Sequence, residues 1–307
     1  MQVWPPVVSL RMMKFKPFML AVGLVLVAVQ CKTINHNVMI NEEPKLVSDQ
    51  FTFTEGPSAD SEGNVYFTDQ PNDKIYVWNW KTNAVTEFMR KTGRANGTYF
   101  DGEDRLHTCS DEKGEIWRIS KDKSVEVLMK GFKGKRLNGP NDLWLDQFGG
   151  IYFTDPLYRR DYWVDFKEEI PEKNLYYRFA NGEVIKIETF KAPNGIIGSI
   201  KQKKLYVSDI DGKKTYVYEI LGEGKLSEKK LFCEMGSDGM TLDEEGNLYL
   251  TGDGVTVFNA KGEKIKHIKI PEEWTGNVTF GGEKGNILFI TASKSVYTLP
   301  TNTRRMK

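Results

Sequence analysis

The feature that most constrains the fold of this 307-residue chain is a short pattern that recurs six times. Each copy is a polar turn followed by a strand of alternating apolar residues, and a second strand follows each copy. Successive copies start 41, 45, 55, 42 and about 40 residues apart. The six copies occupy residues 60–69, 101–110, 146–155, 201–209, 243–252 and 283–292.

Units of 40–50 residues that contain several short strands are typical of β-propeller blades. No segment shows a clear 3.6-residue apolar period, so the pattern does not indicate helices. We therefore predict an all-β, six-bladed β-propeller over residues 43–300, with residues 301–307 as a C-terminal tail. A further strand at Lys45–Phe53 would pair into the last blade and close the ring. A β-sandwich is the alternative, but it would not require six equal units.

The residues before the propeller have the layout of a sorting segment. Residues 18–29 form an apolar run of 12 residues behind three basic side chains, and a membrane-spanning helix needs about 20 residues. This arrangement favours a secretory signal, with a short anchor helix as the alternative. Cys31 closes the run and resembles the lipidation cysteine of a bacterial lipoprotein, although Gln30 is larger than the residue usual before it. We expect residues 1–31 to be the signal, residues 32–42 a linker, and the protein to be exported, either periplasmic or membrane-anchored through Cys31.

Composition and missing motifs exclude several classes of function. The chain has 43 Lys and Arg against 42 Asp and Glu, so it lacks the basic surplus that binding to nucleic acid requires. Its three histidines form no His-x-Glu or His-Glu-x-x-His arrangement, which argues against histidine-built metallohydrolases. The absence of G-x-S-x-G, P-loop and G-x-G-x-x-G motifs argues against serine hydrolases, NTPases and dehydrogenases.

A polar residue recurs 11 or 12 positions before the aromatic or His residue that marks each first strand. Equivalent blade positions form a ring around a propeller axis, so these side chains could converge on one mouth of the channel. The alternative is that Asn and Asp simply occupy turns before strands. Carboxylate and amide oxygens are ligands that suit Ca²⁺, with Mg²⁺, Mn²⁺ or Zn²⁺ as alternatives. The six residues are Glu55, Asn96, Asn141, Asn194, Asp238 and Asn277.

Six short motifs accompany these positions in the order of the repeats. Together they resemble the gluconolactonase/regucalcin (SMP-30) family, and the resemblance runs from about Glu43 to Leu299. Each motif alone is weak, but the set has the order of the family, with one motif for each expected blade. The motifs are Glu55-Gly-Pro57, Asn138-Gly-Pro-Asn-Asp142, Tyr152-Phe-Thr-Asp-Pro156, Pro193-Asn-Gly195, Asp238-Gly-Met240 and Asn277-Val-Thr-Phe-Gly-Gly282.

The resemblance implies one catalytic divalent cation, usually calcium, and hydrolysis of sugar-type lactones. It implies that Glu55, Asn141, Asn194 and Asp238 are the metal ligands, and that Asp238 is also the acid/base residue. Animal members of the family have a substrate-binding Arg two residues before the Asn-Asp pair, where this chain has Gly139. The nearest arginine that could replace it is Arg136, five residues before Asn141. This departure affects the expectation of a gluconate-type substrate more than that of a metal site.

Lactone opening would use the cation as a Lewis acid at the carbonyl oxygen and Asp238 as the general base. Asp142, which is adjacent to Asn141, would orient this ligand without binding the cation itself. Alternatively, Asp142 only caps a turn. Asn96 and Asn277 are further candidates for contacts with the substrate or with the ligands.

The third repeat contains an insertion around Leu157–Asn174. The step between its two strands is 24 residues, against ten in three other repeats, which leaves 14 additional residues. Long loops on compact repeats often carry function. Tyr158, Tyr162 and Trp163 could stack on a sugar, and Arg159 or Arg160 could bind a carboxylate or hydroxyl groups. Alternatively, the aromatic side chains pin a solvated loop to its own blade.

The sequence therefore predicts a lactone hydrolase with a small-molecule substrate and no nucleic-acid partner. Membrane contact is expected only through a lipid on Cys31, and the oligomeric state is open. One alternative is a phosphotriesterase-like hydrolase of the same fold. The other is a non-catalytic propeller that binds carbohydrate or protein, with calcium as a structural plug.

Overall fold

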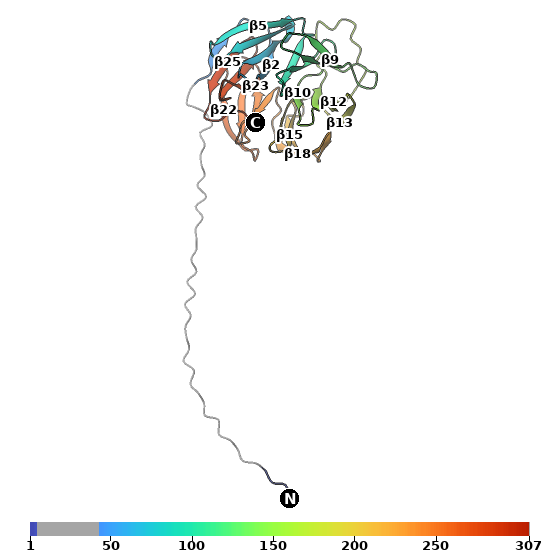
Figure 1. Ribbon diagram of the computed structural model, residues 1–307, viewed down its shortest axis with the longest axis vertical. Coiled ribbons are helices and arrows are strands. Elements are labelled where there is room, and N and C mark those ends of the chain that lie inside the picture. Colours follow the sequence, from blue (N-terminus) through green and yellow to red (C-terminus); the bar gives the residue numbers. More distant parts are fainter. Residues whose placement is uncertain (5–42, 307) are drawn as a thin grey trace. The chain divides into compact units, whose positions relative to one another are not determined.

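Each recurring sequence unit folds into one antiparallel sheet, and six sheets surround a common axis (Figure 1). The computed structural model describes residues 1–4 and 43–306. The export signal, the lipidation site at Cys31 and the linker therefore fall mainly or wholly outside the described residues, and they stay predictions. Within the described ranges, no helix has the length and apolarity that a membrane crossing requires. The prediction of an all-β, six-bladed propeller is confirmed.

The blades are numbered in chain order, and each begins with its innermost strand. Blade 1 contains β2 (Thr54–Ala59), β3 (Val65–Asp69), the 3₁₀ turn η1 (Gln70–Asn72), β4 (Lys74–Asn79) and β5 (Ala84–Arg90). Blade 2 contains β6 (Ala95–Phe100), β7 (Leu106–Ser110), β8 (Glu115–Ile119) and β9 (Val125–Met129). Blade 3 contains β10 (Leu143–Leu145), β11 (Ile151–Asp155), β12 (Lys173–Arg178) and β13 (Val184–Phe190).

The second half of the ring repeats this order. Blade 4 contains β14 (Pro193–Ser199), β15 (Lys204–Asp209), β16 (Lys214–Gly222), β17 (Lys225–Leu226) and β18 (Lys230–Cys233). Blade 5 contains β19 (Met240–Leu242), β20 (Leu248–Gly252), β21 (Gly254–Phe258) and β22 (Lys264–Ile268). Blade 6 contains β23 (Thr275–Gly281), β24 (Ile287–Ala292), β25 (Ser295–Pro300) and, as its outermost strand, β1 (Lys45–Ser48).

The ring is closed by pairing of the two ends of the propeller sequence. Strand β1 pairs antiparallel with β25, with Lys45 opposite Thr298. The expected closing strand is therefore present, although it ends at Ser48 because the chain then turns inward and buries Phe51 against Phe67, with ring centroids 5.1 Å apart. Residues 301–306 also pack against the blades, and the Met306 N–H donates to the Leu242 carbonyl at 3.2 Å.

In four blades, a Thr or Ser near the end of the second strand joins the next blade: Thr68, Thr154, Ser208 and Thr251. The Thr68 hydroxyl of blade 1 donates to the Asn96 carbonyl of blade 2 at 3.1 Å. Thr154 of blade 3 donates to the Asn194 carbonyl of blade 4 at 2.7 Å. Because such a bond fixes the backbone of an inner strand against the preceding blade, it sets the position of the ring residues Asn96 and Asn194.

The Asp that follows this Thr or Ser in three blades fixes the segment before the inner strand of its own blade. Asp155 accepts the N–H groups of Asn138 at 3.1 Å and Gly139 at 2.9 Å. These donors lie three and two residues before Asn141. Asp69 and Asp209 accept N–H groups at the same offsets before Glu55 and Asn194. The Thr-Asp pair of the repeat therefore positions three of the four expected ligands.

We predict that Asp155→Ala lowers the free energy of unfolding by about 2 kcal/mol, because two buried N–H groups lose their acceptor. Urea unfolding of the two proteins measures this difference. Asp122→Ala is the matched control, because the Asp122 carboxylate bonds only to Ser124 in an exposed turn and its loss should cost less than about 0.5 kcal/mol. Equal losses in the two variants would contradict this role of Asp155.

Candidate metal centre

The inner strands begin at one mouth of the channel, and a cavity of about 340 Å³ opens there. Two of the four expected ligands lie in inner strands, Glu55 in β2 and Asn194 in β14, whereas Asn141 and Asp238 lie just before β10 and β19. All four expected metal ligands thus reach one cavity from four blades. The complete lining is Phe53, Glu55, Gln70, Asn96, Asn141, Tyr158, Arg160, Asn194, Ile210, Asp211, Asp238 and Trp274.

Two of the amide groups in this cavity present oxygens that no protein group satisfies. The Oδ1 atoms of Asn96 and Asn194 are buried and accept no hydrogen bond. The Asn194 Nδ2 group donates to the Tyr158 hydroxyl at 3.1 Å, which leaves Oδ1 for another partner. Buried acceptors without partners are costly, so these atoms fit a site that is completed by a cation.

Both carboxyl groups among the expected ligands have a raised pKa. Burial, together with repulsion from Asp238, raises the pKa of Glu55 well above its ordinary value. Burial also raises the pKa of Asp238, although a hydrogen bond from Trp274 and the charge of Arg160 oppose this rise. The Trp274 Nε1–H donates to Asp238 Oδ2 at 2.6 Å. A divalent cation would supply the positive charge that this pair of carboxylates lacks.

The donor set fits a hard cation. Among residues 1–4 and 43–306, no cluster of three or more His, Cys, Asp or Glu side chains could hold a metal. An ion at this mouth would therefore take two carboxylate ligands, from Glu55 and Asp238, and amide oxygens from Asn141 and Asn194. Oxygen ligands of this kind suit Ca²⁺, whereas Zn²⁺ sites usually contain Cys or His.

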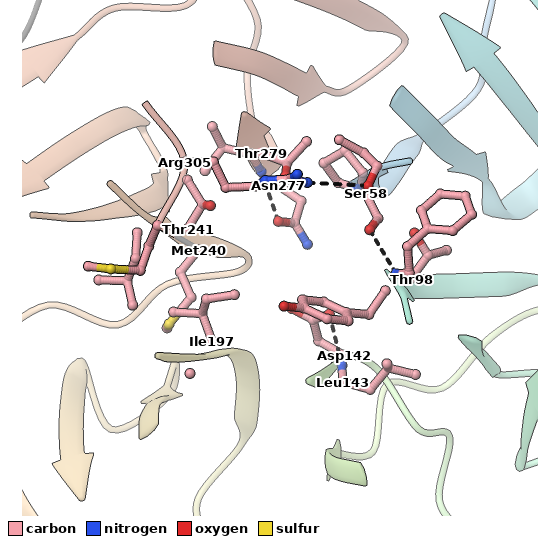
Figure 2. A pocket seen from close by; sticks show the side chains of 18 of the residues that line it. Ser58, Thr98, Asp142, Leu143, Ile197, Met240, Thr241, Asn277, Thr279 and Arg305 are labelled. Carbon is pink, nitrogen blue, oxygen red and sulfur yellow. Dashed lines mark hydrogen bonds between the residues drawn. The ribbon is translucent and has the colours of Figure 1, made fainter. Parts of the chain in front are cut away.

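Asp142 and Asn277 line a second cavity, of about 350 Å³, which none of the four expected ligands lines (Figure 2). The Leu143 N–H donates to Asp142 Oδ1 at 2.9 Å. Burial raises the pKa of Asp142 to about 7, and hydrogen bonding from Asn277 partly opposes this rise. The same Asn277 amide also lowers the pKa of Glu55. Asn277 therefore lies close to a carboxyl group of each cavity.

Comparison with known proteins assigns the family. Residues 53–294 match the family described as SMP-30/Gluconolactonase/LRE-like region. The chain belongs to this family. It is 28% identical to a gluconolactonase of Zymomonas mobilis, in an alignment that covers 84% of this chain and 81% of the relative. It is 26% identical to a diisopropyl-fluorophosphatase of Loligo vulgaris, over 80% of this chain and 87% of the relative.

A solved structure agrees with this assignment. A gluconolactonase from Xanthomonas campestris superposes with a TM-score of 0.78 at 26% identity, covering 86% of this chain and 96% of that structure.

Only some of the predicted substrate-contact residues in and near the long loop of blade 3 line the metal-ligand cavity. Tyr158 and Arg160 line the cavity, but Trp163 and Arg136 do not. Arg136 donates to the carbonyls of Leu137 at 2.8 Å and Glu112 at 3.0 Å. Its guanidinium also lies 5.2 Å from the centre of the Trp163 ring. Arg136 therefore holds the base of the loop, because backbone carbonyls and an aromatic face already occupy its guanidinium.

Five residues of the lining were absent from the predicted site: Phe53, Gln70, Ile210, Asp211 and Trp274. Gln70 is buried, its Nε2 group has no partner, and it is the first residue after β3. The repeat register could have indicated this position, because Ile210 follows the second strand of blade 4 at the equivalent place and also lines the cavity. Trp274 precedes β23 in a loop without a repeated motif, so no sequence signal indicated it.

Proposed function

We propose that this protein is a divalent-metal-dependent hydrolase that opens the ring of a small-molecule lactone. The observation that carries the proposal is the convergence of a buried carboxyl group, Glu55, a half-buried one, Asp238, and unsatisfied amide oxygens in an open cavity. The family membership and the similarity to gluconolactonases support the choice of lactones as the substrate class. The enzyme would be a carboxylic-ester hydrolase.

Glu55, Asn141, Asn194 and Asp238 are proposed to hold the cation, with Ca²⁺ favoured by their all-oxygen donor set. When bound, such an ion polarises a carbonyl oxygen and stabilises the negative charge that develops on it. Asn141 and Asn194 would contribute uncharged oxygens, so the two carboxylates would balance the two charges of the ion. The substrate would enter through the open side of the cavity, beside Tyr158 and Trp274.

Asp238 is proposed as the general base. Trp274 holds one carboxylate oxygen, Oδ2, so the side chain is fixed in orientation at the edge of the cavity. Asp238 would accept a proton from the attacking water while the water oxygen bonds to the lactone carbonyl carbon. As the bond from that carbon to the ring oxygen breaks, the same carboxyl group would return the proton to the leaving oxygen. Burial, which raises the pKa of Asp238, favours this return.

Similarity to the diisopropyl-fluorophosphatase favours one second candidate, hydrolysis of an organophosphate. The same cavity would then receive a phosphoryl oxygen in place of the carbonyl oxygen. Both reactions would use the same proposed ligands and the same cavity, and they differ only in the substrate group that the cavity must accommodate. The range of substrates that the protein hydrolyses therefore distinguishes the two candidates.

We expect the protein to hydrolyse aldonolactones in the presence of Ca²⁺ and to lose this activity after treatment with a chelator. Acid release in a pH-stat measures hydrolysis of aldonolactones, aromatic lactones and organophosphates with one protein preparation. Activity on organophosphates alone would favour the second candidate. Calcium binding without hydrolysis of any of these compounds would favour the non-catalytic binding propeller.

A further inference from the structure

One wall of the metal-ligand cavity carries a positive charge that the proposed ligands do not require. Arg160, in the long loop of blade 3, lines this cavity, and its side chain is 27% exposed. Its closest charged partner is Asp111, with Nε 3.6 Å from Oδ2. The Nε group forms no hydrogen bond, so this pairing leaves hydrogen-bonding capacity of the guanidinium for a ligand.

The loop is fixed at the point from which Arg160 extends. The Tyr162 hydroxyl donates to Asp111, which is buried at the end of β7. The guanidinium of Arg94 lies over the Tyr162 ring, 4.0 Å from its centre. Arg94 in turn donates to the Pro71 carbonyl, next to Gln70 of the cavity lining. Arg160 is therefore held in place before any ligand arrives, which reduces the entropy lost on binding.

Three arginines share the one carboxylate of Asp111. Arg94, Arg136 and Arg160 all act on it and lower its pKa, against the larger effect of burial. Arg94 and Arg136 have further acidic partners: Glu112 lies 3.8 Å from Arg94, and Asp155 and Glu169 act on Arg136. Arg160 has Asp111 as its one ion-pair partner among the described residues, so the shared carboxylate balances its charge only in part. The acidic residue Asp211 of the cavity lining is exposed, so solvent and salt weaken its opposing field.

A partly balanced arginine has a specific use in a hydrolase of this kind. Neutral sugar hydroxyls need hydrogen bonds but no full charge, whereas a carboxylate or phosphate matches the planar fork of an arginine. Because Glu55 and Asp238 balance a divalent ion, the part of the Arg160 charge that Asp111 does not balance is left for the substrate.

We infer that the preferred substrate is a lactone that carries an anionic substituent, a carboxylate or a phosphate, which binds to Arg160. This inference rests on the proposed lactonase function and makes Arg160 a determinant of specificity. It also selects Arg160 over Arg159, whose side chain is exposed and lies 5.7 Å from the centre of the Phe166 ring outside the cavity.

The test compares glucono-1,5-lactone, a glucarolactone with a free carboxylate, and 6-phosphogluconolactone, each with calcium-loaded enzyme. In the wild-type protein, kcat/KM for at least one anionic lactone should exceed that for the neutral lactone about tenfold or more. Arg160→Gln should remove this preference, mainly through KM, and Arg160→Lys should retain part of it. Arg159→Gln, the matched control, should behave as the wild type. The more strongly preferred anionic lactone identifies the group as carboxylate or phosphate.

Two results would overturn the inference while leaving the lactonase proposal intact. One is hydrolysis of the neutral lactone with no preference for either anionic lactone. The other is an equal loss of activity on all three substrates in Arg160→Gln, which would make Arg160 only a support for the loop or for Asp238. Failure to hydrolyse any lactone would instead overturn the proposed function. In that case calorimetry with glucarate and gluconate decides: tighter binding of glucarate that Arg160→Gln abolishes supports the anion site, and equal binding excludes it.

Discussion

Replacing Asp238 by asparagine should reduce lactone hydrolysis at least about a hundredfold, which is the usual loss when a positioned general base is removed. Asparagine keeps the size of the side chain and one oxygen that can coordinate a cation. It also keeps an acceptor for the Trp274 Nε1–H, so the cavity should retain its shape. What the variant loses is the negative charge and the ability to accept a proton. Steady-state rates at saturating Ca²⁺ measure the effect.

Glu55→Gln is the matched control, because it removes the other carboxylate without removing the proposed base. Calcium affinity should fall in both variants, since each loses one of the two charges that oppose the ion. Excess Ca²⁺ should restore hydrolysis in Glu55→Gln but not in Asp238→Asn. Full recovery of both variants would show that Asp238 is only a ligand. Full activity of both variants without added metal would refute the proposal that this cavity is the active site.

Removal of the metal should abolish hydrolysis and lower the melting temperature by about 5 °C or more at pH 8. At a metal concentration 100 times its Kd, binding stabilises a protein by about 2.7 kcal/mol, and each kcal/mol corresponds to roughly 2–4 °C in a domain of this size. Thermal melts with Ca²⁺ and with a chelator give the difference directly.

This difference in melting temperature should shrink as the pH falls to 5. Burial raises the pKa of Glu55 and of Asp238, and repulsion from Asp238 raises that of Glu55 further, so the metal-free protein gains stability from their protonated forms at low pH. That contribution is lost as the pH rises through the raised values, whereas the ion requires the deprotonated groups. Calcium should therefore stabilise most at high pH. A double variant, Glu55→Gln with Asp238→Asn, should show little difference at either pH, and an equal difference at pH 5 and pH 8 in the wild type would contradict the assignment.

The fold and the ligand ring could be predicted because both follow from local, repeated sequence. Alternating apolar residues define each strand, and a constant spacing places Glu55, Asn141, Asn194 and Asp238 in the same position of their blades. Equivalent blade positions surround the propeller axis, so these four side chains meet at the mouth of the channel independently of the loop conformations. For Asp142 the repeat did not indicate which cavity it would face, because adjacent residues in an extended segment point in opposite directions.

The loop of blade 3 could not be predicted in the same way. It occurs once, so no other repeat reveals which of its side chains point inward. Its conformation depends on Asp111 and Arg94, which precede it by many residues and contact Tyr162 only in the folded protein. The sequence therefore suggested Trp163 and Arg136 as substrate contacts, whereas the structure places them outside the cavity and Arg160 inside it.

The pairing of β1 with β25 bears on the order of events during folding. The four proposed ligands come from blades 1, 3, 4 and 5. The two strands whose pairing closes the ring, β1 and β25, lie at opposite ends of the propeller sequence. Contacts between such distant segments form late, because the entropy cost of closing a long loop comes before the free energy that these contacts contribute. A nascent chain that has completed only its first blades would hold Glu55 without Asp238. The cation therefore cannot guide the early steps of folding. Tight binding of the cation would indicate that the last blade has docked.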